Sequence, residues 1–125
     1  MEAKKKRILL VEDEPDFRMA VRIRLEANGY DVIEAEDGAA GLDLARNQSP
    51  DLILLDIMLP KMEGYKVARL LKFDEKFRRI PIIMLTARSQ QTDKETGMAV
   101  GADAYITKPF KPEELLETLT RLLGK

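Results

Sequence analysis

A single carboxylate, that of Asp56, ends the apolar run Leu52–Leu55. An ionised carboxylate among apolar side chains is costly unless it is paired, bound to a metal or placed where the run reaches water. Asp56 is therefore either a strand end that is acidic by chance or a group placed there to react. We expect it at the water-facing end of its strand and not as a buried charge.

Polar residues end or directly follow other short apolar runs, namely Glu12, Asp13, Thr86 and Lys108. Three carboxylates brought together would repel one another unless a cation neutralised them. Because the chain has no His and no Cys, all ligands would be oxygen atoms, which selects a hard ion such as Mg2+ (or Mn2+). Lys108 adds a positive charge and Thr86 a hydroxyl, which together suit a phosphoryl group. Asp56 is then the natural nucleophile, because carboxylates can form acyl phosphates.

The composition limits the classes of function. At 125 residues the chain is long enough for one core and too short for two, so we expect a single domain, 1–125, with a core of about 7–123. The net charge of −1 provides no field for capturing nucleic acid, so direct nucleic-acid binding is disfavoured. The absence of His and Cys excludes imidazole and thiol catalysis. No segment has the length of a membrane span or the pattern of a signal peptide, so the expected location is the cytoplasm.

Short apolar runs alternate with longer amphipathic stretches, which indicates βαβ units and a parallel sheet covered on both faces. The predicted strands are Ile8–Val11, Asp31–Ala35, Leu52–Leu55, Ile80–Thr86 and Ala104–Thr107. The predicted helices run from Pro15 to a stop at Gly29, over Ala39–Asn47, around Tyr65–Phe73, from about Gln91 to Val100, and from Pro112 through a leucine repeat at Leu115, Leu116, Leu119, Leu122 and Leu123. The segment 91–100 contains Gly97 and few large apolar residues, so its helix is expected to be weak or mobile.

Five βα units in a chain of this length predict a doubly wound α/β sandwich. Ligands of such sheets bind at the carboxyl ends of the strands. Glu12 and Asp13 follow the first predicted strand, while Asp56 ends the third, Thr86 ends the fourth and Lys108 ends the fifth. We therefore expect all of these side chains at one edge of the sheet. Each alone has an ordinary explanation, but their joint placement favours a functional site.

The motifs on these residues resemble those of the receiver domain of two-component response regulators, of the single-receiver, chemotaxis-regulator type. They are Val11-Glu12-Asp13-Glu14, Leu55-Asp56-Ile57-Met58-Leu59-Pro60, Thr86-Ala87 and Lys108-Pro109-Phe110, and the match runs from about Arg7 to Leu123. The resemblance implies a five-stranded (βα)5 flavodoxin-like fold with strand order 2-1-3-4-5. It also implies Asp56 as phosphoacceptor, Asp13 and Asp56 as metal ligands together with the main-chain carbonyl of Met58, and Glu12 acting through a metal-bound water.

The resemblance further implies a switch and two kinds of partner. After phosphorylation of Asp56, Thr86 would move to the phosphoryl group, Lys108 would clamp one of its oxygens, and Tyr105 would turn inward. The altered surface, formed by 91–100, the strand Ala104–Thr107 and the last helix, would bind a downstream target. A sensor histidine kinase or histidine phosphotransfer protein would supply the phosphoryl group, with Phe17, Ala20, Pro109 and Phe110 as candidate docking residues. Phe17 is equally compatible with a place in the core, and Tyr105 with that of a half-covered aromatic on an edge strand.

Two rivals share the fold or the chemistry. A magnesium-dependent phosphohydrolase also uses an aspartyl phosphate, but it needs an acid two residues after the nucleophile, where this chain has Met58. A phosphorylation-independent adaptor would keep the fold but should lose at least one of these residues, so the intact acids, Thr86 and Lys108 speak against it. The sequence Asp103-Ala104-Tyr105, and Thr118 where winged-helix regulators carry an Arg, disfavour the receiver dimer of that class, so we expect a monomer or weak dimer. The chain is expected to be either a complete single-domain regulator or a receiver from a longer protein.

Overall fold

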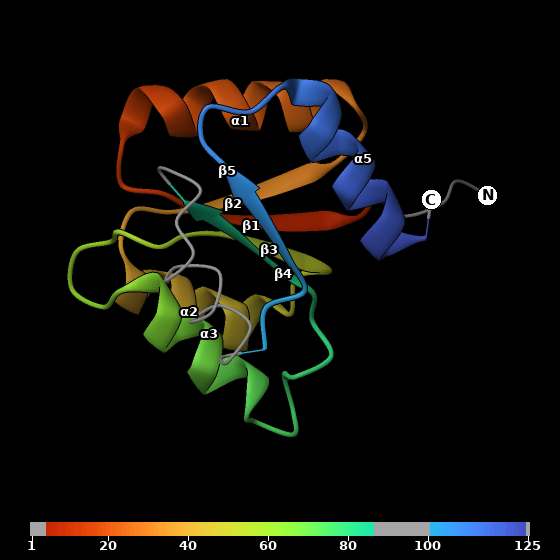
Figure 1. Cartoon of the computed structure of the whole chain (residues 1–125). Coiled ribbons are helices and arrows are strands. Elements are labelled where there is room, and N and C mark those ends of the chain that lie inside the picture. Colours follow the sequence, from red (N-terminus) through yellow and green to blue (C-terminus); the bar gives the residue numbers. More distant parts are fainter. Residues whose placement is uncertain (1–4, 87–100, 125) are drawn as a thin grey trace.

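The computed structural model describes residues 5–86 and 101–124 and contains one parallel sheet of five strands in the order β2-β1-β3-β4-β5 (Figure 1). The strands are β1 (Arg7–Val11), β2 (Asp31–Ala35), β3 (Leu52–Asp56), β4 (Ile82–Thr86) and β5 (Ala104–Thr107). The helices are α1 (Pro15–Ala27), α2 (Gly38–Gln48), α3 (Gly64–Lys72) and α5 (Pro112–Leu123). The helix expected at 91–100 lies outside the described residues. Within the described part of the chain, no helix is long and apolar enough to cross a membrane.

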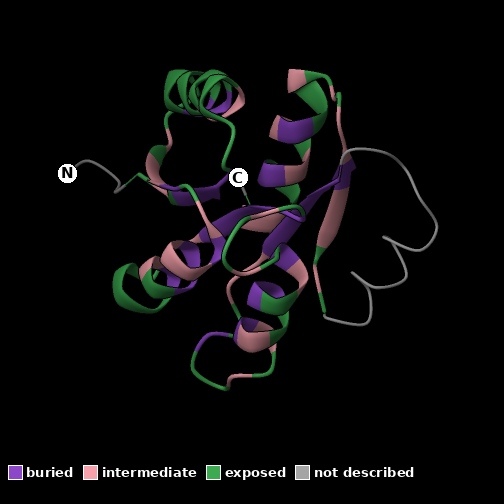
Figure 2. Cartoon of the chain, turned by 90° about the vertical axis from the view of Figure 1, so that its left-hand side faces the viewer, coloured by how far each residue is buried: buried purple, intermediate pink, exposed green. Residues whose placement is uncertain are grey.

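The helices form two layers, with α1 and α5 on one face of the sheet and α2 and α3 on the other (Figure 1). Alternate residues of each strand point to opposite faces. Leu9, Ile53 and Met84 therefore pack with α2 and α3, whereas their neighbours Leu10 and Leu54 pack with α1 and α5. Figure 2 shows the buried residues along the strands and on the inward sides of the helices. The predicted doubly wound sandwich is confirmed, and so is its strand order.

β3 is the central strand, and all of its residues are buried. In the parallel register Leu55 lies beside Val11 of β1 and beside Met84 of β4, and Asp56 lies beside Leu85. Three neighbouring strands therefore end at nearly the same level. This alignment places the residues that follow them at one edge of the sheet.

Asp56 is the last residue of β3, as predicted, whereas Lys108 follows β5, which ends at Thr107. β4 begins at Ile82, two residues later than predicted, because Pro81 has no N–H for the ladder and only its carbonyl pairs, accepting from Ile53 N–H at 2.9 Å. The predicted stop of α1 at Gly29 is borne out, since Gly29 has φ of +90°.

Lys72, at the end of α3, joins this helix to the amino-terminal ends of β4 and β5. Its Nζ lies 2.7 Å from Asp103 Oδ2 and donates to the carbonyl oxygens of Ile80 at 2.8 Å and Arg78 at 3.0 Å. Asp103 Oδ2 also accepts a hydrogen bond from Ile82 N–H at 2.8 Å. All three donors of the Lys72 ammonium are therefore used. The contacts fix the segments that lead into β4 and β5.

Candidate functional site

Three carboxylates meet at the carboxyl-end edge of the sheet, as the sequence predicts. Glu12 and Asp13 follow β1, and Asp56 ends β3; one oxygen of each lies within 4.8 Å of the others. Glu12 is 1% exposed and Asp56 5% exposed, whereas Asp13 is exposed. The group therefore has two buried members and one that faces water.

Lys108 brings the positive charge to the same place from β5. Its Nζ donates to Glu12 Oε1 at 2.9 Å and lies 3.3 Å from Asp56 Oδ1. The backbone holds the lysine as well, because its N–H donates to the carbonyl oxygen of Thr86 at 2.6 Å. Thr86 ends β4 and is 2% exposed. The sheet therefore brings the predicted acids, hydroxyl and amine to one edge.

The expectation that Asp56 avoids burial is wrong. Its carboxyl group is covered, and this desolvation raises its pKa to about 6, with the charge of Glu12 adding to the rise and Lys108 opposing it. Burial by itself lowers the pKa of Lys108, but the hydrogen bond from its ammonium to Glu12 and the charge of Asp56 outweigh burial, so its pKa is raised. Lys108 therefore offsets only part of the rise in the pKa of Asp56 that burial and the charge of Glu12 cause.

A close backbone contact supports the end of β3. Gly64, the first residue of α3, donates its N–H to the carbonyl oxygen of Ile57 at 2.9 Å, and Ile57 N–H donates to the carbonyl oxygen of Leu85 at 3.1 Å. A Cβ atom at position 64 would lie 2.2 Å from the Asp56 carbonyl oxygen. Helix α3 therefore approaches the backbone of Asp56 as closely as only glycine permits.

The acidic group fits a hard divalent cation. Its ligand atoms are all carboxylate oxygens, the donors that Mg2+ and Mn2+ prefer. Three carboxylates face one ammonium, so a divalent ion would neutralise the remaining negative charge. Met58 is 75% exposed and lines an open cavity together with Asp13. The role of its main-chain carbonyl as a further ligand stays a prediction.

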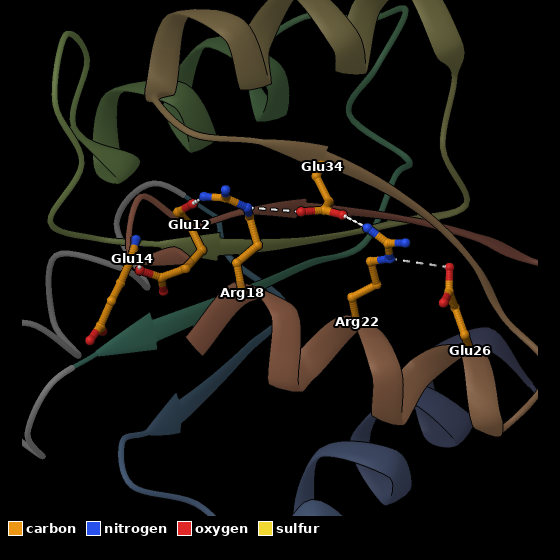
Figure 3. Close-up of polar contacts among 6 residues, drawn as sticks. All are labelled: Glu12, Glu14, Arg18, Arg22, Glu26 and Glu34. Carbon is orange, nitrogen blue, oxygen red and sulfur yellow. Dashed lines mark hydrogen bonds and ion pairs between the residues drawn. The ribbon is translucent and has the colours of Figure 1, made fainter. Parts of the chain in front are cut away.

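An ion-pair network behind Glu12 was not predicted from the sequence (Figure 3). Arg18, on α1, donates from a guanidinium nitrogen to the Glu12 carbonyl oxygen at 2.7 Å and from Nε to Glu34 Oε1 at 2.8 Å. Glu34, on β2, also pairs with Arg22, and Glu14 N–H donates to Glu12 Oε2 at 3.1 Å. The network holds both the backbone and the carboxylate of Glu12. The sequence signal for this network is the i, i+4 spacing of Arg18 and Arg22 on α1. That spacing places both arginines on one side of the helix but does not predict that they pair with Glu34 on β2.

We expect Glu34→Gln to lower the free energy of unfolding by about 1 kcal/mol at pH 7, because the two arginines lose an ionic acceptor. Burial by itself raises the pKa of Glu34, but the hydrogen bonds from Arg22 and Arg18 outweigh it and leave the pKa below its ordinary value. An acid whose pKa is lower in the folded than in the unfolded state stabilises the fold at pH values above the unfolded-state pKa. This stabilisation is lost as the pH falls through the folded-state pKa. The difference between the two proteins should therefore shrink as the pH falls below about 4.

Urea unfolding at pH 7 and at pH 3.5 measures this difference. Glu36→Gln is the matched control, because Glu36 is exposed and follows the same strand; it should change stability by less than about 0.5 kcal/mol at either pH. A Glu34→Gln effect that is equal at both pH values would show that the charge of Glu34 is not its cause.

The predicted switch aromatic, Tyr105, lies half-buried on the edge strand β5. Its hydroxyl is 3.5 Å from that of Tyr65 on α3, and its ring packs against the core cluster on the α2 and α3 face. In this structure Tyr105 is therefore a half-covered aromatic residue on an edge strand, the alternative that the sequence also allows. The inward turn of Tyr105 and the movement of Thr86 stay predictions.

The four candidate docking residues lie together. Phe17, Ala20, Pro109 and Phe110 line one apolar groove between α1 and the start of α5, which also contains Val21, Arg24, Pro112 and Leu115. Phe17 is half-buried and packs against the core cluster on this face. Phe17 therefore belongs both to the edge of the core and to an accessible groove.

Several known proteins are similar to this chain in sequence and in fold. Residues 8–120 match the family described as response regulator receiver domain. The DNA-binding dual master transcriptional regulator RpaA of Synechocystis is 49% identical over 119 residues, which cover 95% of this chain and 49% of that protein. The chain spans about half the length of the curated relatives it matches.

Two solved structures show the same architecture. The chemotaxis response regulator CheY4 of Vibrio cholerae superposes with a TM-score of 0.89 at 35% identity, covering 96% of this chain and 100% of that one. The receiver domain of the sensor histidine kinase PA1611 from Pseudomonas aeruginosa PAO1 gives a TM-score of 0.90 at 38% identity, covering 98% and 100%. That structure has a magnesium ion coordinated in its active site cleft.

Proposed function

The chain belongs to the response regulator receiver domains, and from this premise we propose that it is a phosphorylation-dependent switch that accepts a phosphoryl group on Asp56. The observation that carries the proposal is the contact of Lys108 Nζ with both Glu12 and Asp56 at the shared end of three strands. A lysine placed there balances part of the acidic charge and is close enough to the nucleophile to reach an incoming phosphoryl oxygen.

The side chains that take part in the transfer step all lie at the carboxyl ends of the strands. A carboxylate oxygen of Asp56 forms a bond to phosphorus while the bond from phosphorus to the donor breaks, and the donor leaves with the electron pair. Lys108 and the Thr86 hydroxyl then bind oxygens of the acyl phosphate. A magnesium ion held by Asp13, Asp56 and Glu12, the last through water, would offset the negative charge on these oxygens. Attack by water on phosphorus later releases inorganic phosphate and returns the free carboxylate, so each cycle adds and removes a phosphoryl group on Asp56 of this chain alone.

The donor and the target come from other proteins. The whole sequence contains no His, so a phosphohistidine has to be presented by a sensor histidine kinase or a histidine phosphotransfer protein. The groove that contains Phe17 and Phe110 is the candidate contact for it. The exposed side of β5 and α5 is the candidate contact for the downstream target. A cytoplasmic location and a monomer or weak dimer are part of this proposal.

The downstream effect of phosphorylation is proposed here only in general terms. Relatives such as RpaA are DNA-binding transcriptional regulators of about twice this length. The net charge of −1 does not favour nucleic-acid binding by this segment itself. We propose that any effect on transcription passes through a protein contact or a further segment and not through direct binding of DNA by residues 1–125.

We expect wild-type protein incubated with Mg2+ and acetyl phosphate to gain one phosphoryl group, seen by intact mass. The added mass should disappear in mild alkali, because acyl phosphates hydrolyse there. Excess EDTA should reduce uptake to background, since three carboxylates then face the anionic donor without a cation. Uptake that is stable to alkali or indifferent to EDTA would argue against an aspartyl phosphate formed at this site.

A second measurement separates the switch from a phosphohydrolase. The same protein is incubated with p-nitrophenyl phosphate and Mg2+, and the released phenolate is counted against protein. We expect about one equivalent at first and then slow release limited by hydrolysis of the acyl phosphate, because Met58 stands where an acid would be needed to activate water for rapid turnover. Rapid release of many equivalents per chain would favour the enzyme, and no uptake from any donor would favour an adaptor.

A further inference from the structure

The ammonium group of Lys108 also lies over an aromatic ring. Its Nζ is 4.3 Å from the centroid of Phe17, on α1. The Phe17 ring is in turn fixed by an edge contact with Phe110, at 5.8 Å between centroids and an angle of 84°. A cation at this distance over a ring face is attracted by the ring's quadrupole. Lys108 is therefore held from three sides, by Glu12, Asp56 and Phe17.

The ring restrains the lysine in a way that a carboxylate cannot. It carries no lone pair that competes for an N–H, so the donors of the ammonium stay available to the acids and to an incoming phosphoryl oxygen. The side chain of Lys108 is 20% exposed, and in such a partly desolvated place the attraction is stronger than at a surface. Lysine has four rotatable bonds, and a fixed face reduces the conformations open to it.

We propose that Phe17 is a positioning residue for Lys108, holding its ammonium beside Asp56 in the geometry needed for phosphoryl transfer. The kinetic part rests on the proposed function of Asp56, whereas the contact itself does not. Phe17 also lines the groove with Ala20 and Phe110. One side chain therefore belongs to both the candidate docking surface and the reaction site, so an occupant of the groove that shifts the ring also changes the restraint on Lys108.

The contact is tested first without any phosphoryl chemistry. Protons above a ring face are shifted upfield by the ring current, so the ε-methylene protons of Lys108 should be displaced from those of the other lysines in a proton–carbon correlation spectrum. The displacement should be lost in Phe17→Leu, which keeps an apolar side chain, and kept in Phe17→Tyr, which keeps the ring. An undisplaced Lys108 signal in the wild type would overturn the proposal.

The positioning role is tested by the rate of uptake from acetyl phosphate at saturating Mg2+, a donor too small to need the groove. We expect Phe17→Leu to be about five- to tenfold slower than wild type, and Phe17→Tyr to stay within about twofold. Phe77→Leu is the control for loss of an aromatic ring elsewhere, because Phe77 is buried on the other face and also lies under a cation, with Lys76 Nζ at 5.7 Å; it should also stay within about twofold.

The outcomes separate this inference from the function on which it rests. Equal rates for wild type and Phe17→Leu, or a Phe17→Tyr rate as low as that of Phe17→Leu, would overturn the role of the ring while uptake itself continued. No uptake by the wild type would instead refute the phosphoryl-acceptor function and, with it, the kinetic role of Phe17. The ring-current shift would still report the contact in that case.

Discussion

Asp56→Asn should take up no phosphoryl group under conditions in which the wild type takes up one. An amide oxygen is a poor nucleophile and cannot form an acyl phosphate, and the other two acids of the group follow β1, with Glu12 already paired to Lys108. Intact mass after incubation with acetyl phosphate and Mg2+ measures the loss. Asp31→Asn is the matched control, since Asp31 is exposed at the opposite end of the sheet, and it should behave as wild type.

The same substitution should stabilise the fold at high pH. Burial raises the pKa of Asp56 to about 6, against about 4 in an unfolded chain. The folded state therefore holds this proton more tightly, and wild-type stability falls as the pH rises from about 4 through 6. The amide of the Asp56→Asn variant does not ionise, so without metal its advantage should grow over this range and reach about 2 to 3 kcal/mol at pH 8.

Urea unfolding in EDTA at pH 5 and pH 8 tests the sign. The difference between Asp56→Asn and wild type should be larger at pH 8, and added Mg2+ should narrow it by stabilising only the wild-type carboxylate site. A difference that is greater at pH 5 would contradict the raised pKa. Asp31→Asn should show no such growth with pH.

Gly64→Ala should lower the free energy of unfolding by about 3 kcal/mol or more. Its Cβ would lie 2.2 Å from the Asp56 carbonyl oxygen and 2.9 Å from Ile57 Cα, and both are backbone atoms that cannot turn away. Relief requires α3 to move away from the end of β3, which also displaces Asp56. Chemical denaturation measures the loss, and phosphoryl uptake by the remaining folded protein should be slower.

Gly29→Ala separates this steric effect from the general cost of replacing glycine. Gly29 has φ of +90°, but no atom lies within 4 Å of the place that a Cβ would take, so the substitution should cost only about 1 kcal/mol through backbone strain. Equal costs at the two positions would mean that α3 can retreat from Asp56 without penalty. The close approach would then not be what holds the end of β3.

The fold and the membership of the site could be predicted because both depend on order along the chain. Alternation of apolar runs with amphipathic stretches predicts the parallel sheet, and the rule that ligands bind at the carboxyl ends of strands places Asp56, Thr86 and Lys108 together. The buried run Leu52–Leu55 marked the central strand correctly. Apolar runs and the polar residues at their ends are features of single elements, so they can be read directly from the sequence.

The parts that could not be predicted depend on distances between elements. Asp56 is buried because α3 lies against its backbone and because Lys108 and Glu12 lie beside its carboxylate. These contacts join separate elements, so no single stretch of the sequence predicts them. The contact of Arg18 with Glu12 needs the angle at which α1 crosses β1 and β2. The place of Phe17 over Lys108 likewise joins the first helix to the last strand.

The ion pair between Glu12 and Lys108 joins residues 96 positions apart in the chain. Contacts of such separation form late, because closing a long loop costs entropy before any contact rewards it, and during synthesis the amino-terminal part emerges first. A chain that has built β1 and β3 but not yet β5 carries Glu12, Asp13 and Asp56 without the ammonium of Lys108. Under the proposed function, nascent or partly unfolded copies should therefore be poorer phosphoryl acceptors than fully folded ones.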